Sequence, residues 1–270
     1  MIINLAFSPC PNDTFIFDAL VNDKIDTEGL DFRIVLSDVE QLNKWSIQHR
    51  FHVTKLSYYA FTKCFNSYKI LDSGSAIGEG CGPLLIKKPN TVLCDSSKIA
   101  IPGDYTTANM LLGLAYPHLK NKDAVIFSEI EKLILQNKYD AGVIIHENRF
   151  TYKKRGLVKE QDLGDFWHNE TNLPIPLGGI VVSRDLSLEI QYKIDRVIMR
   201  SIKYAFDNKP YLSEYVKSNA QEISDDVIKS HINLYVNDFS LSLGDVGRKS
   251  VLKIFEKLNI ESSNIFLEER

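Results

Sequence analysis

Short apolar segments alternate with helical segments through most of the chain, and this alternation restricts the fold more than any other feature. Strands are expected at residues 2–7, 30–36, 52–56, 98–101 and 141–145, with helices between them. Strands and helices joined by short links predict an α/β protein whose mostly parallel sheets are flanked by helices. Beyond residue 188 apolar side chains recur at helical spacing, so the last part of the chain is expected to be nearly all helix.

Two breaks in this pattern suggest how the chain is divided. Polar or irregular segments occupy residues 87–97 and 174–179. They predict two lobes joined by two crossings and closing over a ligand, as in two-lobed small-molecule binding folds. We expect residues 1–94 and 178–270 to form a large lobe and residues 95–177 a small lobe. A single domain with one doubly wound sheet is the competing interpretation.

Composition excludes several classes of protein. Hydrophobic residues make up 44% and charged residues 25% of the 270 residues, as in ordinary globular proteins. The net charge of -3 and the isoelectric point near 6.1 argue against nucleic acid or an anionic membrane as a partner. No apolar run approaches the roughly 20 residues of a membrane span. The sequence begins with a strand pattern and not with a basic, apolar leader, so we expect a cytoplasmic protein.

The cysteine pattern gives no sign of a metal centre. Four cysteines, at positions 10, 64, 81 and 94, form no C-x-x-C pair and have no histidine at zinc-finger spacing. They are interpreted as reduced, mostly buried thiols. We therefore expect no metal.

The stretch SPCPNDT at residues 8–14 joins the first strand to the first helix. Two prolines stiffen this turn, and Asn12 or Asp13 is expected to cap the helix. Because open α/β sheets bind ligands at the carboxyl ends of their strands, Pro9, Cys10 and Asn12 are candidates for lining a cleft. At a helix start the thiol pKa can fall, which would make Cys10 a nucleophile. A small buried residue that supports the turn is the interpretation we favour.

Two further strand ends carry polar groups. Thr106 and Thr107 begin a helix, where their hydroxyls and the free N–H groups suit a carboxylate or phosphate. Ordinary capping by one threonine explains them equally well. Lys55, Leu56 and Ser57 close another strand and bring a cation and a hydroxyl to the same kind of edge. The alternative is that the lysine is a solvated residue at a strand end.

The strand at residues 141–145 delivers His146 to its carboxyl end. An imidazole, with a pKa of about 6.5, suits a general base or acid in a cleft that closes. The alternative is a hydrogen-bonded structural histidine. Glu147 and Arg149 are placed to orient His146 or the ligand, although Arg149 alternatively pairs with Glu147 or faces water.

Taken together, these stretches resemble the 1,4-dihydroxy-6-naphthoate synthase family of the futalosine route to menaquinone. The resemblance covers essentially the whole chain and depends on seven motifs that occur in order. They are SPCPNDTF at 8–15, KLS at 55–57, GxGCGPL at 78–84, IPGxxTTA at 101–108, GVIIHExRFTY at 142–152, PLGG at 176–179 and HIxxYVN at 231–237.

The resemblance implies a cytoplasmic, two-lobed fold similar to type II periplasmic binding proteins. It implies a carbon–carbon lyase that converts cyclic dehypoxanthine futalosine to 1,4-dihydroxy-6-naphthoate, releasing the sugar-derived fragment without a metal or organic cofactor. Thr106 is added to the site on the helix-start argument alone. The resemblance also implies His146 as the proton acceptor, Lys55, Leu56 and Ser57 on one side of the substrate, and Thr107 and Ala108 on the other.

Two other functions remain open at this stage. One is a non-catalytic protein that binds a small carboxylate, although the chain shows neither an export leader nor a DNA-binding or signalling module. The other is the chorismate dehydratase of the same pathway, in which we would not expect the SPCPNDT and GVIIHE stretches together. The helical tail is a candidate face for a homodimer.

Overall fold

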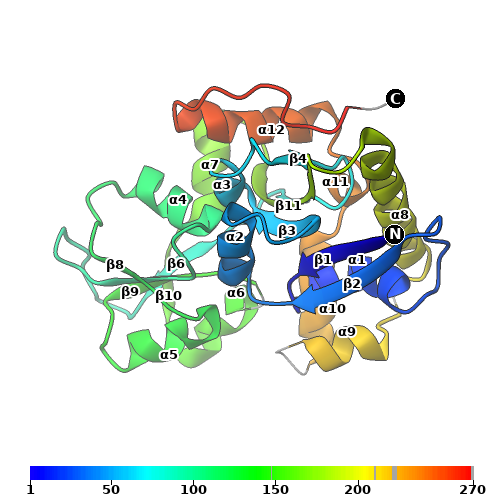
Figure 1. Ribbon diagram of the computed structural model, residues 1–270. Coiled ribbons are helices and arrows are strands. Elements are labelled where there is room, and N and C mark those ends of the chain that lie inside the picture. Colours follow the sequence, from blue (N-terminus) through cyan, green and yellow to red (C-terminus); the bar gives the residue numbers. More distant parts are fainter. Residues whose placement is uncertain (147, 210, 221–223, 269–270) are drawn as a thin grey trace.

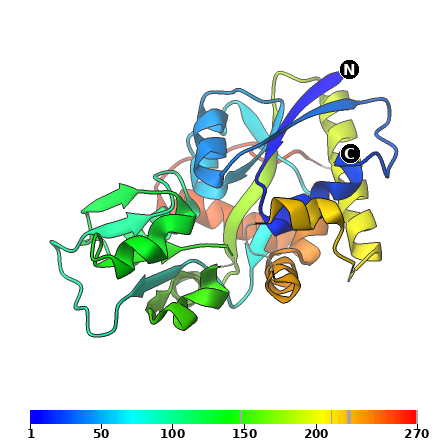
Figure 2. The same cartoon turned by 90° about the horizontal axis from the view of Figure 1, so that it is seen from below.

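The computed structural model describes residues 1–146, 148–209, 211–220 and 224–268, and two α/β units lie side by side in it (Figures 1 and 2). Six strands form the first sheet: β1 (Ile2–Phe7), β2 (Asp31–Leu36), β3 (Val53–Ser57), β4 (Tyr68–Ile70), β5 (Ala76–Gly78) and β11 (Ile175–Ser183). Their order is β2-β1-β3-β11-β4, and β5 also pairs with β11. The pairs β1–β2 and β1–β3 are parallel, whereas β11 runs antiparallel to its three neighbours.

The second sheet has five strands: β6 (Leu84–Lys87), β7 (Ile99–Ile101), β8 (Lys122–Ala124), β9 (Ala141–Ile144) and β10 (Val158–Asp162). Their order is β10-β6-β9-β7-β8. The pairs β7–β8 and β7–β9 are parallel, and β6 is antiparallel to β9 and β10. Both sheets are therefore mixed, and the expectation of mostly parallel sheets is wrong. The antiparallel pairs all involve β6 or β11, which are the strands that directly follow the two connections between the sheets.

The crossings occupy residues 79–83 and 163–174, the second of which contains α7 (Leu163–Thr171). Strand β6 precedes the boundary that the sequence suggested at residue 94, yet it pairs within the second sheet. Its three apolar residues suit a buried strand of either sheet, so its composition did not indicate to which sheet β6 belongs. The division into lobes at residues 94 and 178 stays a prediction.

Four helices pack against one side of the first sheet. They are α1 (Pro11–Val21), α8 (Leu188–Asp207), α9 (Glu214–Asn219) and α10 (Asp225–Tyr235). Their apolar side chains share one core with β1 and β11, which contains Phe7, Phe17, Ile180 and Ile198. The rings of Phe7 and Phe17 stack with their centroids 4.2 Å apart.

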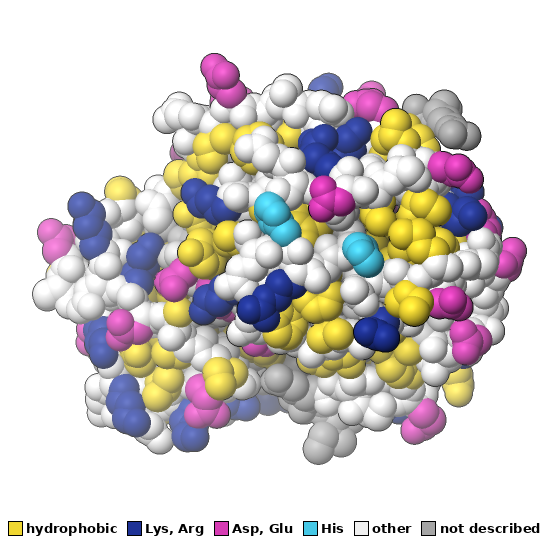
Figure 3. Space-filling model, in the orientation of Figure 1, with side chains coloured by type: hydrophobic (Ala, Val, Ile, Leu, Met, Phe, Trp, Pro, Cys, Tyr) yellow, Lys and Arg dark blue, Asp and Glu magenta, His cyan; other side chains and the backbone are white. Residues whose placement is uncertain are grey.

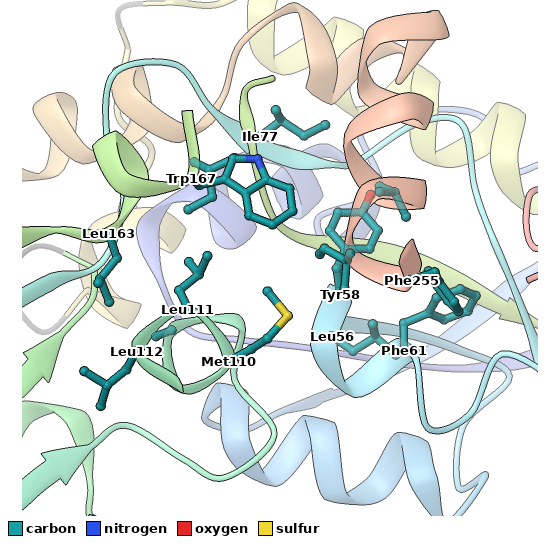
Figure 4. Close-up of a cluster of buried hydrophobic side chains, with 14 of the residues drawn as sticks. Leu56, Tyr58, Phe61, Ile77, Met110, Leu111, Leu112, Leu163, Trp167 and Phe255 are labelled. Atoms are coloured by element: carbon teal, nitrogen blue, oxygen red, sulfur yellow. The ribbon is translucent and has the colours of Figure 1, made fainter. Parts of the chain in front are cut away.

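A second core is common to both units. It joins β3, α3 (Tyr58–Phe61) and α12 (Gly244–Lys257) to α4 (Thr107–Ala115) and α7. Figure 4 shows Met110 and Trp167 on one side of this cluster and Leu56, Tyr58 and Phe255 on the other. Because α4, which lies outside both crossings, is buried in this cluster with β3 and α3, the two units are also held together outside the crossings.

The remaining helices are short or cover the second sheet and the edge of the first. They are α2 (Val39–Ile47), α5 (Ile130–Leu135), α6 (Asn148–Thr151), α11 (Asp238–Leu241) and the 3₁₀ helices η1 (Phe127–Glu129) and η2 (Tyr152–Arg155). Within the described ranges, no helix combines the length and hydrophobicity needed to span a membrane. Acidic and basic side chains are interspersed on the face shown in Figure 3.

Candidate active site

A cavity of about 730 Å³, counted to its open mouth, is lined by residues of both units. Many of the residues singled out in the sequence line it: Asn12, Lys55, Leu56, Ser57, Thr106, Thr107, Ala108 and His146. Pro9, Cys10 and Arg149 are not among the lining residues.

Lys55 is buried, with 7% of its surface exposed, so the alternative interpretation of a solvated lysine at the strand end is wrong. Its Nζ lies 3.4 Å from Asp13 Oδ1 and donates to the Gly74 carbonyl at 2.8 Å. Asp13 Oδ2 accepts from the Ser8 hydroxyl at 2.6 Å and from the Ser8 N–H at 3.3 Å, while Oδ1 accepts from Asn12 Nδ2 at 2.8 Å. Lys55 thus brings its charge to the cavity wall as part of a buried ion pair.

The start of α1 differs from the expected cap. Cys10 is the N-cap residue and makes no side-chain capping bond, and Pro11 is the first helical residue. Asn12 and Asp13 lie inside the first turn, so capping by either is wrong. Proline has no N–H and occupies the first helical position readily. The Asp13 side chain accepts a hydrogen bond from Ser8 instead of capping the helix.

The start of α4 forms another wall. The Thr106 hydroxyl caps this helix by accepting from the Asn109 N–H at 3.2 Å, and it donates to the Gly103 carbonyl at 2.8 Å. The Thr107 hydroxyl donates to the Leu177 carbonyl at 2.8 Å. Both hydroxyls therefore have structural partners. The first amides of a helix have no acceptor within the helix. Thr107 and Ala108, which lie in this first turn, line the cavity.

Helix α2 contacts both of these walls. Asn43 accepts from the Ser57 N–H at 2.9 Å and donates to the Ser57 hydroxyl at 3.1 Å. One turn earlier, the Glu40 carboxylate accepts from the N–H groups of Asp104 at 3.0 Å and Tyr105 at 3.1 Å. Burial raises the pKa of Glu40 above its usual value. One helix therefore holds the end of β3 and the turn that precedes α4.

His146 follows β9 and has a φ of 57°, in the left-handed region. Its ring meets that of Phe127 edge-on with the centroids 4.7 Å apart, and its Nε2 lies 3.5 Å from Cys10 Sγ. The ring of His231 is 5.9 Å away, centroid to centroid. Glu147, which the sequence suggested as an orienting neighbour, lies outside the described residues.

Arg149 turns toward the second sheet. Its Nη2 lies 2.8 Å from Asp162 Oδ2, and its Nη1 donates to the Gly82 carbonyl. The guanidinium thus connects the end of β10 to the glycine-rich crossing. The sequence suggested that Arg149 orients His146 or the ligand, pairs with Glu147 or faces water. Its pairing with Asp162 was not predicted.

Sequence reasoning missed several residues at the cavity. Asp13 was considered only as a cap, and Ser8, Leu177 and Tyr235 were not considered as lining residues. These three residues could have been suggested as lining residues because Ser8, Leu177 and Tyr235 all lie within the motifs quoted above. Among the described residues, no group of three or more His, Cys, Asp or Glu side chains is arranged to hold a metal ion.

A family model described as menaquinone biosynthesis matches residues 3–259. The chain belongs to this family. A relative from Thermus thermophilus is 41% identical over 253 residues, which is 94% of this chain and 92% of the relative. Another from Streptomyces coelicolor is 34% identical over 255 residues, 92% of this chain and 90% of the relative. Both are named 1,4-dihydroxy-6-naphthoate synthase, which confirms the resemblance found in the motifs.

Solved structures agree with the expected fold. A crystal structure of an Archaeoglobus fulgidus protein matches with a TM-score of 0.89 and 32% identity, covering 96% of this chain and 97% of that one. The ligand-binding component of an ABC-type import system from Staphylococcus aureus matches with a TM-score of 0.68 and 12% identity, covering 99% and 96%. At this identity the second match concerns the fold alone, and it confirms a fold like that of periplasmic binding proteins.

Proposed function

We propose that this protein is a 1,4-dihydroxy-6-naphthoate synthase of menaquinone biosynthesis. It acts as a carbon–carbon lyase on cyclic dehypoxanthine futalosine, in the cytoplasm and without a metal or organic cofactor. The observation that carries the proposal is the 41% identity to a synthase over 94% of the chain. The convergence on one cavity of motifs from distant parts of the sequence supports it.

The substrate defines what the cavity has to do. It is a carboxylated bicyclic ketone with a spiro-linked sugar remnant, and the product is an aromatic naphthoate. Removing a proton beside the carbonyl gives an enolate. Cleavage of the carbon–carbon bond to the sugar remnant, which leaves with the bonding electron pair and takes up a proton, completes aromatisation. Such a reaction needs one base, donors for the developing oxyanion, an anchor for the carboxylate and exclusion of water.

His146 is the proposed base. It lies at the cavity on the carboxyl side of β9, where its edge-on contact with Phe127 and its neighbours Cys10 and His231 restrict the ring. A neutral imidazole has the basicity for proton abstraction near neutral pH. The proton removed from the substrate carbon is carried by this ring when the enolate forms.

Two sets of donors face the same cavity. The first-turn N–H groups at Thr107 and Ala108 lie at the positive end of α4, which favours an anionic group. Across the cavity, the Ser57 hydroxyl and the Lys55 ammonium provide polar and positively charged groups. We assign the developing enolate oxygen to the N–H groups at the α4 start and the substrate carboxylate to the Lys55 side.

Turnover of cyclic dehypoxanthine futalosine by the purified protein, followed by mass-resolved product analysis, tests the proposal. His146→Asn is the variant, because asparagine tolerates the left-handed backbone of this position. His49→Asn is its control, since His49 is an exposed histidine with a φ of 55°. We expect naphthoate from wild type and His49→Asn, and almost none from folded His146→Asn.

Other results would identify which part of the proposal fails. Naphthoate from all three proteins would keep the reaction and exclude His146 as the base. No naphthoate from wild type, together with tight binding of the substrate or product, would favour the binding-protein alternative. Dehydration of chorismate by wild type instead would assign the other enzyme of the pathway.

A further inference from the structure

The motif HIxxYVN at residues 231–237 has no part in the proposed chemistry, yet three of its side chains reach the cavity or its surroundings. Tyr235 lines the cavity, and Asn237 Nδ2 donates to the Ile77 carbonyl at 2.8 Å. His231, in α10, is completely buried, and its Nε2 lies 2.9 Å from Asn12 Oδ1. This contact joins two segments that are 219 residues apart in the sequence.

The direction of each hydrogen bond in this region follows from the chemistry of the groups. The Asp13 carboxylate, paired with Lys55, accepts hydrogen bonds, so the amide that faces it at 2.8 Å is the NH₂ group of Asn12. The oxygen of that amide then faces His231. An amide oxygen only accepts, so Nε2 of His231 is the donor and carries the ring proton.

The surroundings of His231 favour a neutral ring. Burial lowers its pKa well below the usual value, and the nearby His146 lowers it further. The Tyr235 ring packs against it with a centroid separation of 4.8 Å. A neutral ring donates one hydrogen bond from Nε2 and adds no positive charge beside His146.

We propose that His231 is a positioning residue for the active site, acting through Asn12. Its Nε2–H holds the Asn12 amide, the Asn12 NH₂ group holds Asp13, and Asp13 fixes the ammonium of Lys55 at the cavity wall. This inference rests on the proposed function, because it assigns His231 to the substrate-binding side of that reaction. It excludes a role for His231 as a carrier of the proton that His146 accepts.

A matched pair of variants separates a hydrogen-bond donor from a basic ring. In His231→Gln the terminal amide NH₂ replaces the donor near the position of Nε2, whereas His231→Met has a similar shape without a donor. Because His231 acts on the substrate only through the position of Lys55, its loss should weaken binding by about one hydrogen bond, and about 1.4 kcal/mol corresponds to about tenfold in affinity. We expect His231→Met to raise KM about tenfold, His231→Gln to raise it no more than about threefold, and both to keep the wild-type pH profile of kcat.

A double variant tests the route through Asn12. If His231 acts through that amide, Asn12→Ala combined with His231→Met should raise KM no further than Asn12→Ala alone. Additive increases would overturn the proposal. Equal losses of kcat in His231→Gln and His231→Met with a shifted pH profile would overturn it in favour of proton transfer. Wild-type KM and kcat in both folded variants would overturn it in favour of a purely structural role.

The ring tautomer gives a measurement that does not depend on turnover. In ¹⁵N-labelled wild type, long-range ring correlations should show His231 neutral and protonated at Nε2 from about pH 6 to 8. A proton at Nδ1, or ordinary titration of His231 in this range, would overturn the inference. If the tautomer is as expected and wild type makes no naphthoate, the proposed function fails while the hydrogen-bond network remains.

Discussion

Replacing Lys55 with methionine should destabilise the protein strongly, because it removes one partner of a buried ion pair. The side chains of Lys55 and Asp13 are 8% and 3% exposed, so solvent screens their interaction little. Asp13 would keep its donors Ser8 and Asn12, but the Gly74 carbonyl would lose the Nζ donor. The variant therefore leaves a buried carboxylate without its cation and a carbonyl without its hydrogen bond.

The expected loss follows from these two deficits. Removing one member of a buried pair costs about 3–5 kcal/mol, and the donors that Asp13 keeps favour the lower end. The Gly74 carbonyl adds about 1 kcal/mol, so the free energy of unfolding should fall by about 4 kcal/mol. With an unfolding entropy of about 2.1 cal/mol/K for each of the 270 residues, Tm should fall by about 7 °C.

Thermal and urea unfolding at neutral pH measure this loss. Lys44→Met is the control, since Lys44 is 45% exposed and 3.7 Å from Glu40, and it should cost no more than about 0.5 kcal/mol. Adding Asp13→Asn to Lys55→Met should recover about 1–2 kcal/mol, because the uncompensated charge is removed. A Lys55→Met protein within about 0.5 kcal/mol of wild type would refute the account of this ion pair.

Three further predictions concern residues at the cavity or next to it. Burial raises the pKa of Glu40, so the folded protein holds this proton more tightly and loses stability as pH rises above about 4.5. Glu40→Gln should flatten the dependence of the urea midpoint on pH in this range, and an unchanged dependence would contradict the assignment. Gly178→Ala would place a Cβ 2.6 Å from the Leu56 carbonyl oxygen, so thermal unfolding should show a loss of about 2 kcal/mol, whereas wild-type stability would contradict the close approach. Cys10→Ser should keep kcat/KM within about threefold of wild type, and a loss of about a hundredfold or more would assign a nucleophile beside His146.

The meeting of three distant motifs at one cavity was predictable because each of the three follows a strand. Ser57 ends β3, Thr106 lies in the turn after β7, and His146 lies just beyond β9. Polar residues at such strand ends gather at the edge where α/β proteins bind ligands. The local pattern was therefore enough to select these residues and to suggest a base and an anion site among them.

Other features depend on contacts that the local pattern does not contain. Nothing near Lys55 in the sequence indicates that its partner is Asp13, and nothing near Asn12 indicates that its oxygen meets His231. The same holds for β6, whose apolar residues suit either sheet. Periodicity reports which face of an element is buried, whereas partners across the fold are set by topology and side-chain direction.

The positions of the shared core and of Glu40 indicate where the cavity would open. The core around Leu56 and Trp167 joins both units through buried apolar side chains, and separating it would expose large hydrophobic surface. At α2, by contrast, the units are joined by the hydrogen bonds from Asp104 and Tyr105 to Glu40, which water can replace. We therefore expect entry of a substrate to break the Glu40 contacts while the core stays closed.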